Sequence, residues 1–333
     1  MIDITVICAL LIVLGIILYV ILDGFDLGVG IIFPFAPDEA SKNKMMSSIA
    51  PVWDGNETWL IYGGGILFAA FPIAYSILLP ALYIPLMLLI FALMFRGVAF
   101  EFRMKAKESR WIWDYSFTFG STLAAFSQGL ILGSLIEGFE VKNMQFAGGS
   151  FNWLTSFSIT TGFGVVFGYA LLGASWAILK TDNPTKEWAK NIAKPLNFIL
   201  GLFVLMVSLK TPIQYPEIAD KWFSFPNFFI LLPIPLIAIF CWLKIFDSLS
   251  KDKDNQPFIF TVAIFILSFV GLGYSLWPYI IVNNLTIWDL AAPAKSLQLV
   301  FITLMISFPI VLGYTLFVYK LFKGKVLEKD SYY

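Results

Sequence analysis

The sequence predicts an all-α membrane protein that crosses the bilayer several times. Of its 333 residues, 59% are hydrophobic and only 13% are charged, whereas a soluble domain carries about a quarter charged residues. The apolar residues form runs of about 20, the length that a helix needs to cross the hydrocarbon core. A soluble enzyme is therefore excluded. The equal numbers of basic and acidic residues, 22 each, give no indication of a nucleic-acid partner.

Nine apolar runs are long enough to be spanning helices. They cover residues 4–30, 52–73, 75–100, 113–137, 153–180, 191–210, 222–245, 257–280 and 297–321. The loops are short and no linker divides the chain, so we expect one transmembrane domain over residues 1–333. The helix order predicts two four-helix bundles plus one peripheral helix. The first run exceeds the length of a span, so we expect its end to be tilted or to lie at the interface.

The lysines and arginines indicate the orientation of this domain. If nine helices alternate in direction, 18 of the 22 basic residues fall on one side. They lie in the loops 31–51, 96–112, 180–194 and 244–256 and in the C-terminal tail. Loops with an excess of Lys and Arg remain in the cytoplasm. We therefore expect the N-terminus outside and the C-terminus in the cytoplasm.

Two pairs of carboxylates lie where the first two helices meet the cytoplasmic side. Asp23 and Asp26 follow the first apolar run in ILDGFDLGVG, and Asp54 and Glu57 begin the second helix in PVWDGNETWL. The members of each pair are three residues apart and share a helix face. Carboxylates are costly at membrane depth and usually functional there, and neighbouring buried carboxyl groups can take up and release protons. The pattern indicates a proton route.

Three further residues are expected to support these acids. Trp53 and Asn56 lie beside them in the second helix, and Arg96 lies at the same depth near the end of the third, in FRGVAFEFR. Arg96 either pairs with one of the acids or extends its charge to the interface.

Simpler interpretations exist for most of these residues. Asp23 and Asp26 could cap a helix end or meet interfacial water, and Asp54 could be the N-cap of the second helix. Four tryptophans are equally typical of an interfacial aromatic belt: Trp53, Trp59, Trp111 and Trp113. Three acids are expected on a solvated loop face: Glu101, Glu108 and Asp114.

The chain offers few ligands for a redox centre. It has no histidine and two isolated cysteines, Cys8 and Cys241. Haem and most zinc sites rely on imidazole, and the cysteines form neither a C-x-x-C motif nor a disulfide framework. We expect no catalytic residue, no metal and no directly bound cofactor here, so any redox chemistry belongs to another chain.

Four motifs resemble those of subunit II of the cytochrome bd-type quinol oxidases. They are DGFDLGVG, SIAPVWDGNETWL, FRGVAFEFR and the late LTIWD with SLQL, and the resemblance covers nearly the whole chain. It implies a haem-free subunit of a bacterial inner-membrane complex that reduces dioxygen to water with electrons from membrane quinol. It also implies a heterodimer with a haem-bearing subunit I, which holds haems b and d and the quinol site.

The resemblance also implies roles for single residues. Asp54 of WDGN is the first candidate for a proton route from the cytoplasm to the haems, with Asp23, Asp26 and Glu57 as its neighbours. Arg96 looks like a structural or quinone-proximal cation. Some members carry His where this chain has Val52, so a route through that imidazole cannot operate here. The form PVWDGNETWL is similar to the branch often called cyanide-insensitive.

A stand-alone proton-coupled or cation transporter is the alternative function, because membrane carboxylates suit it equally well. Transporters often contain inverted repeats, whereas the paired acids occur only in the first half of this chain. That asymmetry argues against the alternative. The sequence leaves open whether the chain binds a quinone or lipid and whether small single-helix subunits attach.

Overall fold

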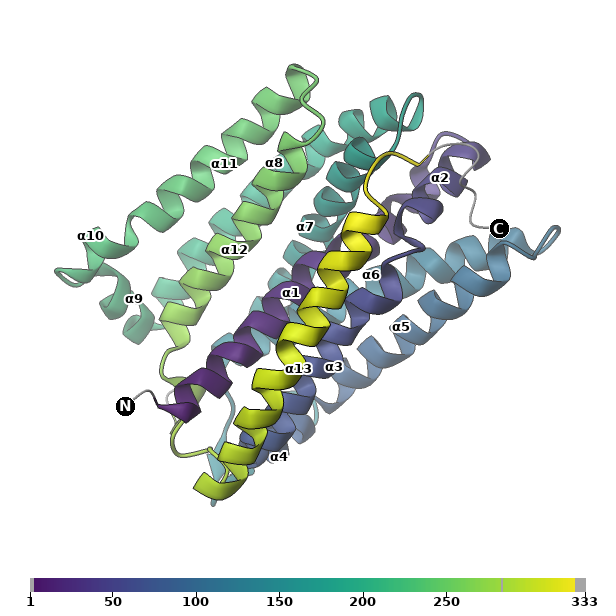
Figure 1. Cartoon of the computed structure of the whole chain (residues 1–333). Coiled ribbons are helices and arrows are strands. Elements are labelled where there is room, and N and C mark those ends of the chain that lie inside the picture. Colours follow the sequence, from purple (N-terminus) through teal and green to yellow (C-terminus); the bar gives the residue numbers. More distant parts are fainter. Residues whose placement is uncertain (1–2, 283, 327–333) are drawn as a thin grey trace.

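The chain forms long helices that run side by side along one axis of the molecule (Figure 1). The structure is a computed structural model that describes residues 3–282 and 284–326. The N-terminus and the C-terminus lie at opposite ends of the helices. Lys329, which was counted with the predicted cytoplasmic tail, lies outside the described residues.

Helices account for nearly all of the regular structure. Those of the first half are α1 (Ile4–Ile32), the 3-10 turn η1 (Phe33–Phe35), α2 (Glu39–Ile49), α3 (Trp53–Ala70), α4 (Pro72–Ala81), α5 (Tyr83–Arg103) and α6 (Arg110–Glu137). Those of the second half are α7 (Ser156–Lys180), α8 (Thr185–Gln214), α9 (Pro216–Phe223), α10 (Asn227–Leu231), α11 (Pro233–Ser250), α12 (Gln256–Leu276) and α13 (Ala294–Leu321).

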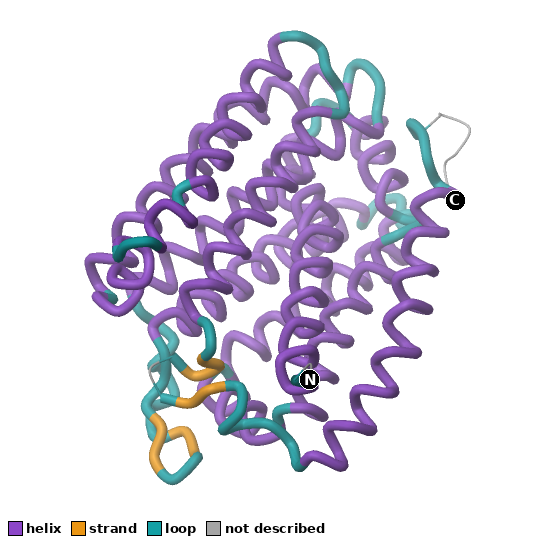
Figure 2. The backbone as a smooth tube through the Cα atoms, turned by 60° about the vertical axis from the view of Figure 1, so that its left-hand side comes forward, coloured by secondary structure: helices purple, strands orange, loops and turns teal. Residues whose placement is uncertain are grey.

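Two small antiparallel hairpins lie toward the N-terminal end of the molecule (Figure 2). They pair β1 (Val141–Lys142) with β2 (Gln145–Phe146) and β3 (Tyr279–Ile281) with β4 (Leu285–Thr286). Asp289 belongs to the turn after β4, where its Oδ2 accepts hydrogen bonds from the backbone and hydroxyl of Thr286 at 2.8 and 2.6 Å. These hydrogen bonds hold the turn between β4 and α13 together.

Within the described residues, eight helices are long and apolar enough to cross a membrane. They are α1 with η1, α5, α6, α7, α8, α10 with α11, α12 and α13. The all-α membrane fold is confirmed. Helix α3 has 18 residues, or about 27 Å, and is less apolar because its first two turns contain Asp54, Asn56 and Glu57. The count of nine spans and the outside position of the N-terminus stay predictions.

The predicted second and third spans differ most from the observed helices. Residues 52–73 and 75–100 form α3, α4 and α5, because the chain leaves helical geometry at Phe71 and Leu82. Pro72 begins α4, and proline disfavours helical geometry in the residue before it. Smaller differences affect the helix ends: α8 begins six residues before the predicted 191, and α11 continues to Ser250 instead of 245.

Glycines allow very close crossings between helices. A Cβ added at Gly28 of α1 would lie 1.8 Å from the carbonyl oxygen of Tyr169, and one added at Gly173 of α7 would lie 2.2 Å from the carbonyl carbon of Gly28. Helices α6 and α7 touch in the same way, since a Cβ at Gly129 would lie 2.5 Å from the Cα of Gly162. Backbone contact at these positions leaves no room for any side chain.

These crossings join the two predicted groups of helices. Helices α1, α3, α5 and α6 contact one another on one side, and α7, α8, α11 and α12 on the other. Helix α7 also packs directly on α1 and α6, so the two groups share one buried core. Helix α13 lies against α3 and α1 at the surface (Figure 1).

The loops rich in Lys and Arg gather at one end of the molecule. Lys44 of α2 donates to Asp182 after α7 at 2.8 Å. Asp254, before α12, accepts hydrogen bonds from Lys186 of α8 at 2.7 Å and from Lys325 after α13 at 3.2 Å. Partial burial opposes ionisation of Asp254, but these two hydrogen bonds prevail and lower its pKa. Asp254 is therefore an ionised tether between three segments at neutral pH.

We predict that Gly28→Ala pushes α1 away from α7, because the new methyl group would meet backbone that cannot move aside. Overpacking of this kind costs about 1–3 kcal/mol. Gly273→Ala in α12 is the matched control, since a Cβ there meets no described atom within 4 Å. Thermal unfolding in detergent should show a lower midpoint for Gly28→Ala only; equal midpoints for the two variants would contradict the crossing.

Candidate functional site

Arg96 of α5 is the centre of a buried cluster of charges. Its Nη1 donates to Oδ1 of Asp23 at 2.9 Å and to Oε1 of Glu57 at 2.6 Å, and its Nη2 lies 3.9 Å from Oδ2 of Asp26. The side chains of Arg96, Asp23 and Asp26 are 0% exposed, and that of Glu57 is 23% exposed. Helices α1, α3 and α5 therefore bring three carboxylates to one guanidinium group.

The spacing of Asp23 and Asp26 on α1 explains how both reach Arg96. They lie on one helix face, and every residue of α1 from Asp23 to Gly30 is buried. Helix α1 continues to Ile32 beyond them. The interpretation of these acids as end caps or as groups in interfacial water is wrong, because α7 and α3 cover this part of α1.

Arg96 is held in place from two sides. Helix α6 backs it closely, since a Cβ added at Gly120 would lie 2.9 Å from the backbone nitrogen of Arg96. The guanidinium carbon lies 5.8 Å from the centre of the Trp53 ring, a distance at which a cation is attracted to the ring face. Trp53 itself stacks on Phe100 at 4.9 Å. The interpretation that Arg96 extends to the interface is wrong.

Asn56 connects the cluster to a fourth helix. Its Nδ2 donates to Oδ2 of Asp26 at 2.6 Å and to the carbonyl of Leu22 at 3.2 Å. Its Oδ1 accepts a hydrogen bond from the Tyr319 hydroxyl of α13 at 3.0 Å. The sequence pointed to Asn56 but not to Tyr319, because a tyrosine near the end of an apolar helix is typical of the interfacial belt.

A hydrogen-bond chain approaches Asp23 from the opposite side. The Tyr169 hydroxyl of α7 donates to Oε1 of Gln128 at 2.6 Å, and Nε2 of Gln128 donates to the Tyr19 hydroxyl at 2.9 Å. Tyr19 lies one helical turn before Asp23 on the same face of α1. Sequence reasoning missed this chain. The one indication of this chain in the sequence was Gln128, the single amide side chain within the apolar helix α6.

Asp54 lies outside the buried cluster. It is exposed in the first turn of α3, and the N-cap of this helix is Val52, without a capping side chain. The alternative interpretation of Asp54 as the N-cap is therefore wrong. One exposed stripe of α3 consists of Asp54, Thr58, Ile61, Gly64, Gly65 and Phe68. Glu57 is one turn after Asp54, at the edge between this stripe and the cluster.

The buried cluster leaves both donors and acceptors unpaired and carries more acids than bases. Within the described residues, four of its atoms have no hydrogen-bond partner: Oδ2 of Asp23, Oδ1 of Asp26, and Nε and Nη2 of Arg96. When all three carboxylates are ionised, they exceed the single guanidinium by two negative charges. Uncompensated buried charge is costly, and each proton that binds removes one such charge. This arrangement can therefore hold protons.

The remaining predicted tryptophans have different environments. Trp59 is 0% exposed and packs edge-on against Tyr62 and Phe308, so its assignment to an interfacial belt is wrong. Trp111 is 62% exposed, and Trp113 stacks on Phe102 at 4.9 Å.

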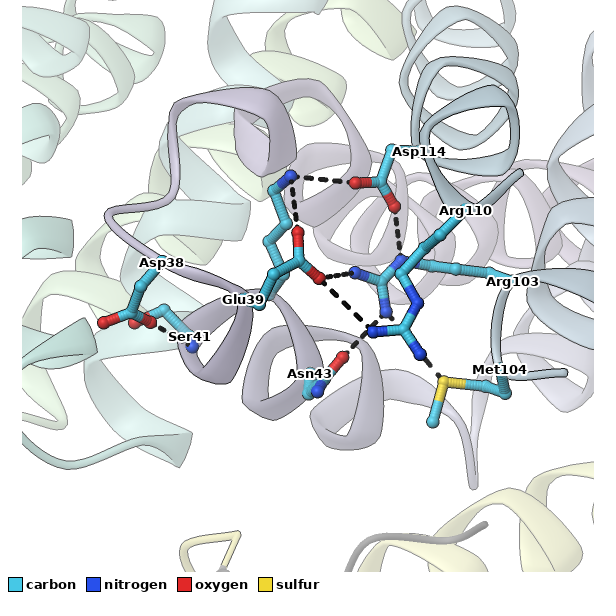
Figure 3. Close-up of polar contacts among 9 residues, drawn as sticks. Asp38, Glu39, Ser41, Asn43, Arg103, Met104, Arg110 and Asp114 are labelled. Atoms are coloured by element: carbon cyan, nitrogen blue, oxygen red, sulfur yellow. Dashed lines mark hydrogen bonds and ion pairs between the residues drawn. The ribbon is translucent and has the colours of Figure 1, made fainter. Parts of the chain in front are cut away.

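A second charged cluster fixes α2 against α5 and α6 (Figure 3). Arg103, wholly buried, donates to Asp114 at 2.5 Å, to Asn43 at 2.8 Å and to Glu39 at 3.0 Å. Lys42 also donates to Asp114 at 2.8 Å and to Glu39 at 3.1 Å. Arg110 also lies 3.7 Å from Glu39, so three bases face two acids. No excess of carboxylates is left that could hold protons, which indicates a structural role.

Asp114 therefore corrects one expectation. It was assigned to a solvated loop face, but its side chain is only 13% exposed, because α2 folds over the start of α6. Glu101, with a 56% exposed side chain, and Glu108 are exposed as expected. Within residues 3–282 and 284–326, no group of three or more His, Cys, Asp or Glu could hold a metal ion.

We predict that Arg96→Met is far more harmful than Arg110→Met. Loss of Arg96 leaves buried carboxylates without a counter-charge, which costs about 3–5 kcal/mol. Arg110 is the control, because its side chain is 35% exposed and lies 3.7 Å from Glu39. The unfolding midpoint in detergent should fall strongly for Arg96→Met only. Similar small decreases for both variants would mean that the buried ion pairs do not hold the helices together.

Comparison with known proteins gives a consistent result. Residues 4–322 match the family described as cytochrome bd terminal oxidase subunit II. The chain is 28% identical to cytochrome bd ubiquinol oxidase subunit 2 of Bacillus subtilis, over 93% of each chain. It is 27% identical to cytochrome bd-I ubiquinol oxidase subunit 2 of Escherichia coli K12, over 94% of this chain and 92% of the relative.

A solved structure supports the fold independently. The structure of bd oxidase from Geobacillus thermodenitrificans matches with a TM-score of 0.80 at 18% identity, over 96% of this chain and 98% of that chain. At this identity the likeness shows the fold alone. The family match, however, includes every membrane-spanning helix described above. The chain belongs to the cytochrome bd terminal oxidase subunit II family.

Proposed function

We propose that this chain supports a haem-bearing subunit I and carries part of the proton route to it. Family membership makes the chain a component of a quinol oxidase complex. In this proposal, haems b and d, the quinol site and the reduction of dioxygen to water belong to subunit I. The absence of histidine from this chain is in keeping with that division. Family membership also removes the support for a stand-alone transporter.

The observation that carries the proton route is a gradual change in exposure along the acids. Asp54 is exposed, Glu57 one turn later is 23% exposed, and Asp23 and Asp26 are 0% exposed. Arg96 contacts the last three. A proton can thus pass from a surface carboxylate to an edge carboxylate and then to a buried pair around a fixed cation. Arg96 acts in this proposal as the counter-charge and not as a quinone contact.

The direction of the route follows from the expected orientation. Asp54 begins α3 directly after α2, at the end where the Lys and Arg loops gather. The positive-inside rule assigns that end to the cytoplasm. Reduction of dioxygen to water consumes protons, and their uptake from the cytoplasm would make the reaction generate a membrane potential. In this proposal, the chain therefore delivers cytoplasmic protons.

The exposed stripe of α3 is the proposed contact with subunit I. A carboxylate such as Asp54 is costly in contact with lipid, so we expect water or a partner chain to cover it. Added Cβ atoms at Gly64 and Gly65 would meet no described atom within 4 Å. Small residues of this kind let a helix of another chain approach closely. The same stripe thus provides both the docking face and the mouth of the route.

We predict that Asp54→Asn and Glu57→Gln each slow oxygen reduction by about tenfold or more, because an amide cannot carry the proton. Glu101→Gln is the control, since Glu101 is an exposed acid at the same end of the molecule, paired with Lys105. Quinol-driven oxygen consumption and the haem absorbance of the purified complex should be measured together.

The two measurements separate the possible outcomes. Slow turnover with normal haem content is expected for the two variants and normal turnover for the control. Normal turnover of Asp54→Asn and Glu57→Gln in an assembled complex would exclude the route. A loss of haem in parallel with activity would show that these acids are structural.

A further inference from the structure

The hydrogen-bond chain on the far side of Asp23 has no part in the proposed proton route. We propose that Tyr169, Gln128 and Tyr19 are positioning residues that keep Asp23 ionised as the permanent counter-charge of Arg96, so that the exchanging protons reside on Asp26 and Glu57. This inference rests on the proposed proton route and assigns different roles to its carboxylates.

The direction of the chain is fixed by the amide of Gln128. Its oxygen accepts from the Tyr169 hydroxyl at 2.6 Å, and its nitrogen donates to the Tyr19 oxygen at 2.9 Å. Because the Tyr19 oxygen already accepts this hydrogen bond, its own proton is available to another acceptor. Asp23 follows one turn later, and its Oδ2 has no hydrogen-bond partner within the described residues. All donors of the chain thus point toward Asp23.

The chain is built into the close contact between α1 and α7. Tyr19 is 3% exposed and Tyr169 is 1% exposed. A Cβ added at Gly24 would lie 2.8 Å from Cε1 of Tyr169. The glycine beside Asp23 therefore makes room for the tyrosine ring that begins the chain. Hydrogen bonds in a buried chain polarise one another, so the bond from Gln128 makes the Tyr19 hydroxyl a stronger donor.

The three carboxylates differ in the donors that they receive. Asp23 accepts a hydrogen bond from the guanidinium at 2.9 Å, and the Tyr19 end of the chain lies one turn before it on the same helix face. Asp26 has the neutral Asn56 amide at 2.6 Å, and its contact with Arg96 is 3.9 Å long. Glu57 reaches Arg96 at 2.6 Å but is partly exposed. Donors directed at a carboxylate favour its ionised form, and of the two wholly buried acids Asp23 is the one that accepts directly from the guanidinium.

Charge balance places the exchanging protons on Asp26 and Glu57. The titratable and charged groups that face Asp23 from the surrounding helices are Tyr19, Asp26, Glu57, Arg96, Tyr169 and Tyr319. Helix α6 contributes only the neutral Gln128. An ionised Asp23 neutralises the one cation. Any further ionised carboxylate adds uncompensated charge, and protons bound at Asp26 and Glu57 remove it.

Infrared spectroscopy of the assembled complex tests this inference, because protonated and ionised carboxyl groups absorb at different frequencies. Tyr19→Phe should raise the protonated fraction of Asp23 about tenfold, since it removes the donor proposed for this charged group, and Gln128→Leu should raise it in the same direction, since it removes the group that holds and polarises the Tyr19 hydroxyl. The result is an additional carboxylic-acid C=O band that shifts in D2O and disappears when Asp23→Asn is added. Ser127→Ala is the control, since it removes a neighbouring buried hydroxyl outside the chain.

An unchanged carboxyl spectrum in Tyr19→Phe and Gln128→Leu would overturn the inference. If either variant fails to assemble, Tyr169→Phe carries the same test, because it removes only the first donor and should give a weaker band of the same kind. The infrared result and the turnover result can be told apart. Normal turnover of the Asp54 and Glu57 variants would refute the route, whereas the Asp23 band reports only on the hydrogen-bond chain.

Discussion

The contact between Arg96 and three carboxylates is the constraint on which the rest of the structure depends. A buried cation without partners would be prohibitively costly, and so would the acids without Arg96. The contacts at 2.9 and 2.6 Å tie α5 to α1 and α3, and Asn56 extends the tie to α13 through Tyr319. One ionic centre therefore fixes the relative positions of four helices and creates the excess of acids that can hold protons.

Close backbone crossings bury this centre. Gly28 and Gly173 bring α7 onto α1 just beyond the acids, and Gly120 brings α6 onto the backbone of Arg96. Glycine costs helix stability in water, but here it allows contacts that no larger residue permits. Gly24 adds a direct link between packing and electrostatics, because the space beside it holds the ring of Tyr169. The motif DGFDLGVG thus combines two acids with the glycines that bury them.

Much of this could be predicted from sequence, and the failures have physical reasons. Hydrophobic run length predicted the all-α fold, and spacing placed Asp23 and Asp26 on one face. The exposure of Asp54 follows from helix geometry, since residues two apart lie about 200° around the axis and Asn56 faces the cluster. Tyr169 and Tyr319 could not be found, because they bond to Gln128 and Asn56 from helices distant in sequence. The buried state of Asp114 depends on how α2 folds back, which no local pattern shows.

The most direct test of the central claim is the rate of proton uptake during a single turnover of the complex with Asp26→Asn. Asp26 is wholly buried, and among the described residues it accepts a hydrogen bond from Asn56 and lies 3.9 Å from Arg96. The variant complex should therefore assemble and accept electrons normally. A pH-sensitive dye in the medium should then report proton uptake slower than in the parent complex by about tenfold or more, while the haems are reduced at the parental rate. Uptake at the parental rate would contradict the role of this cluster in proton transfer.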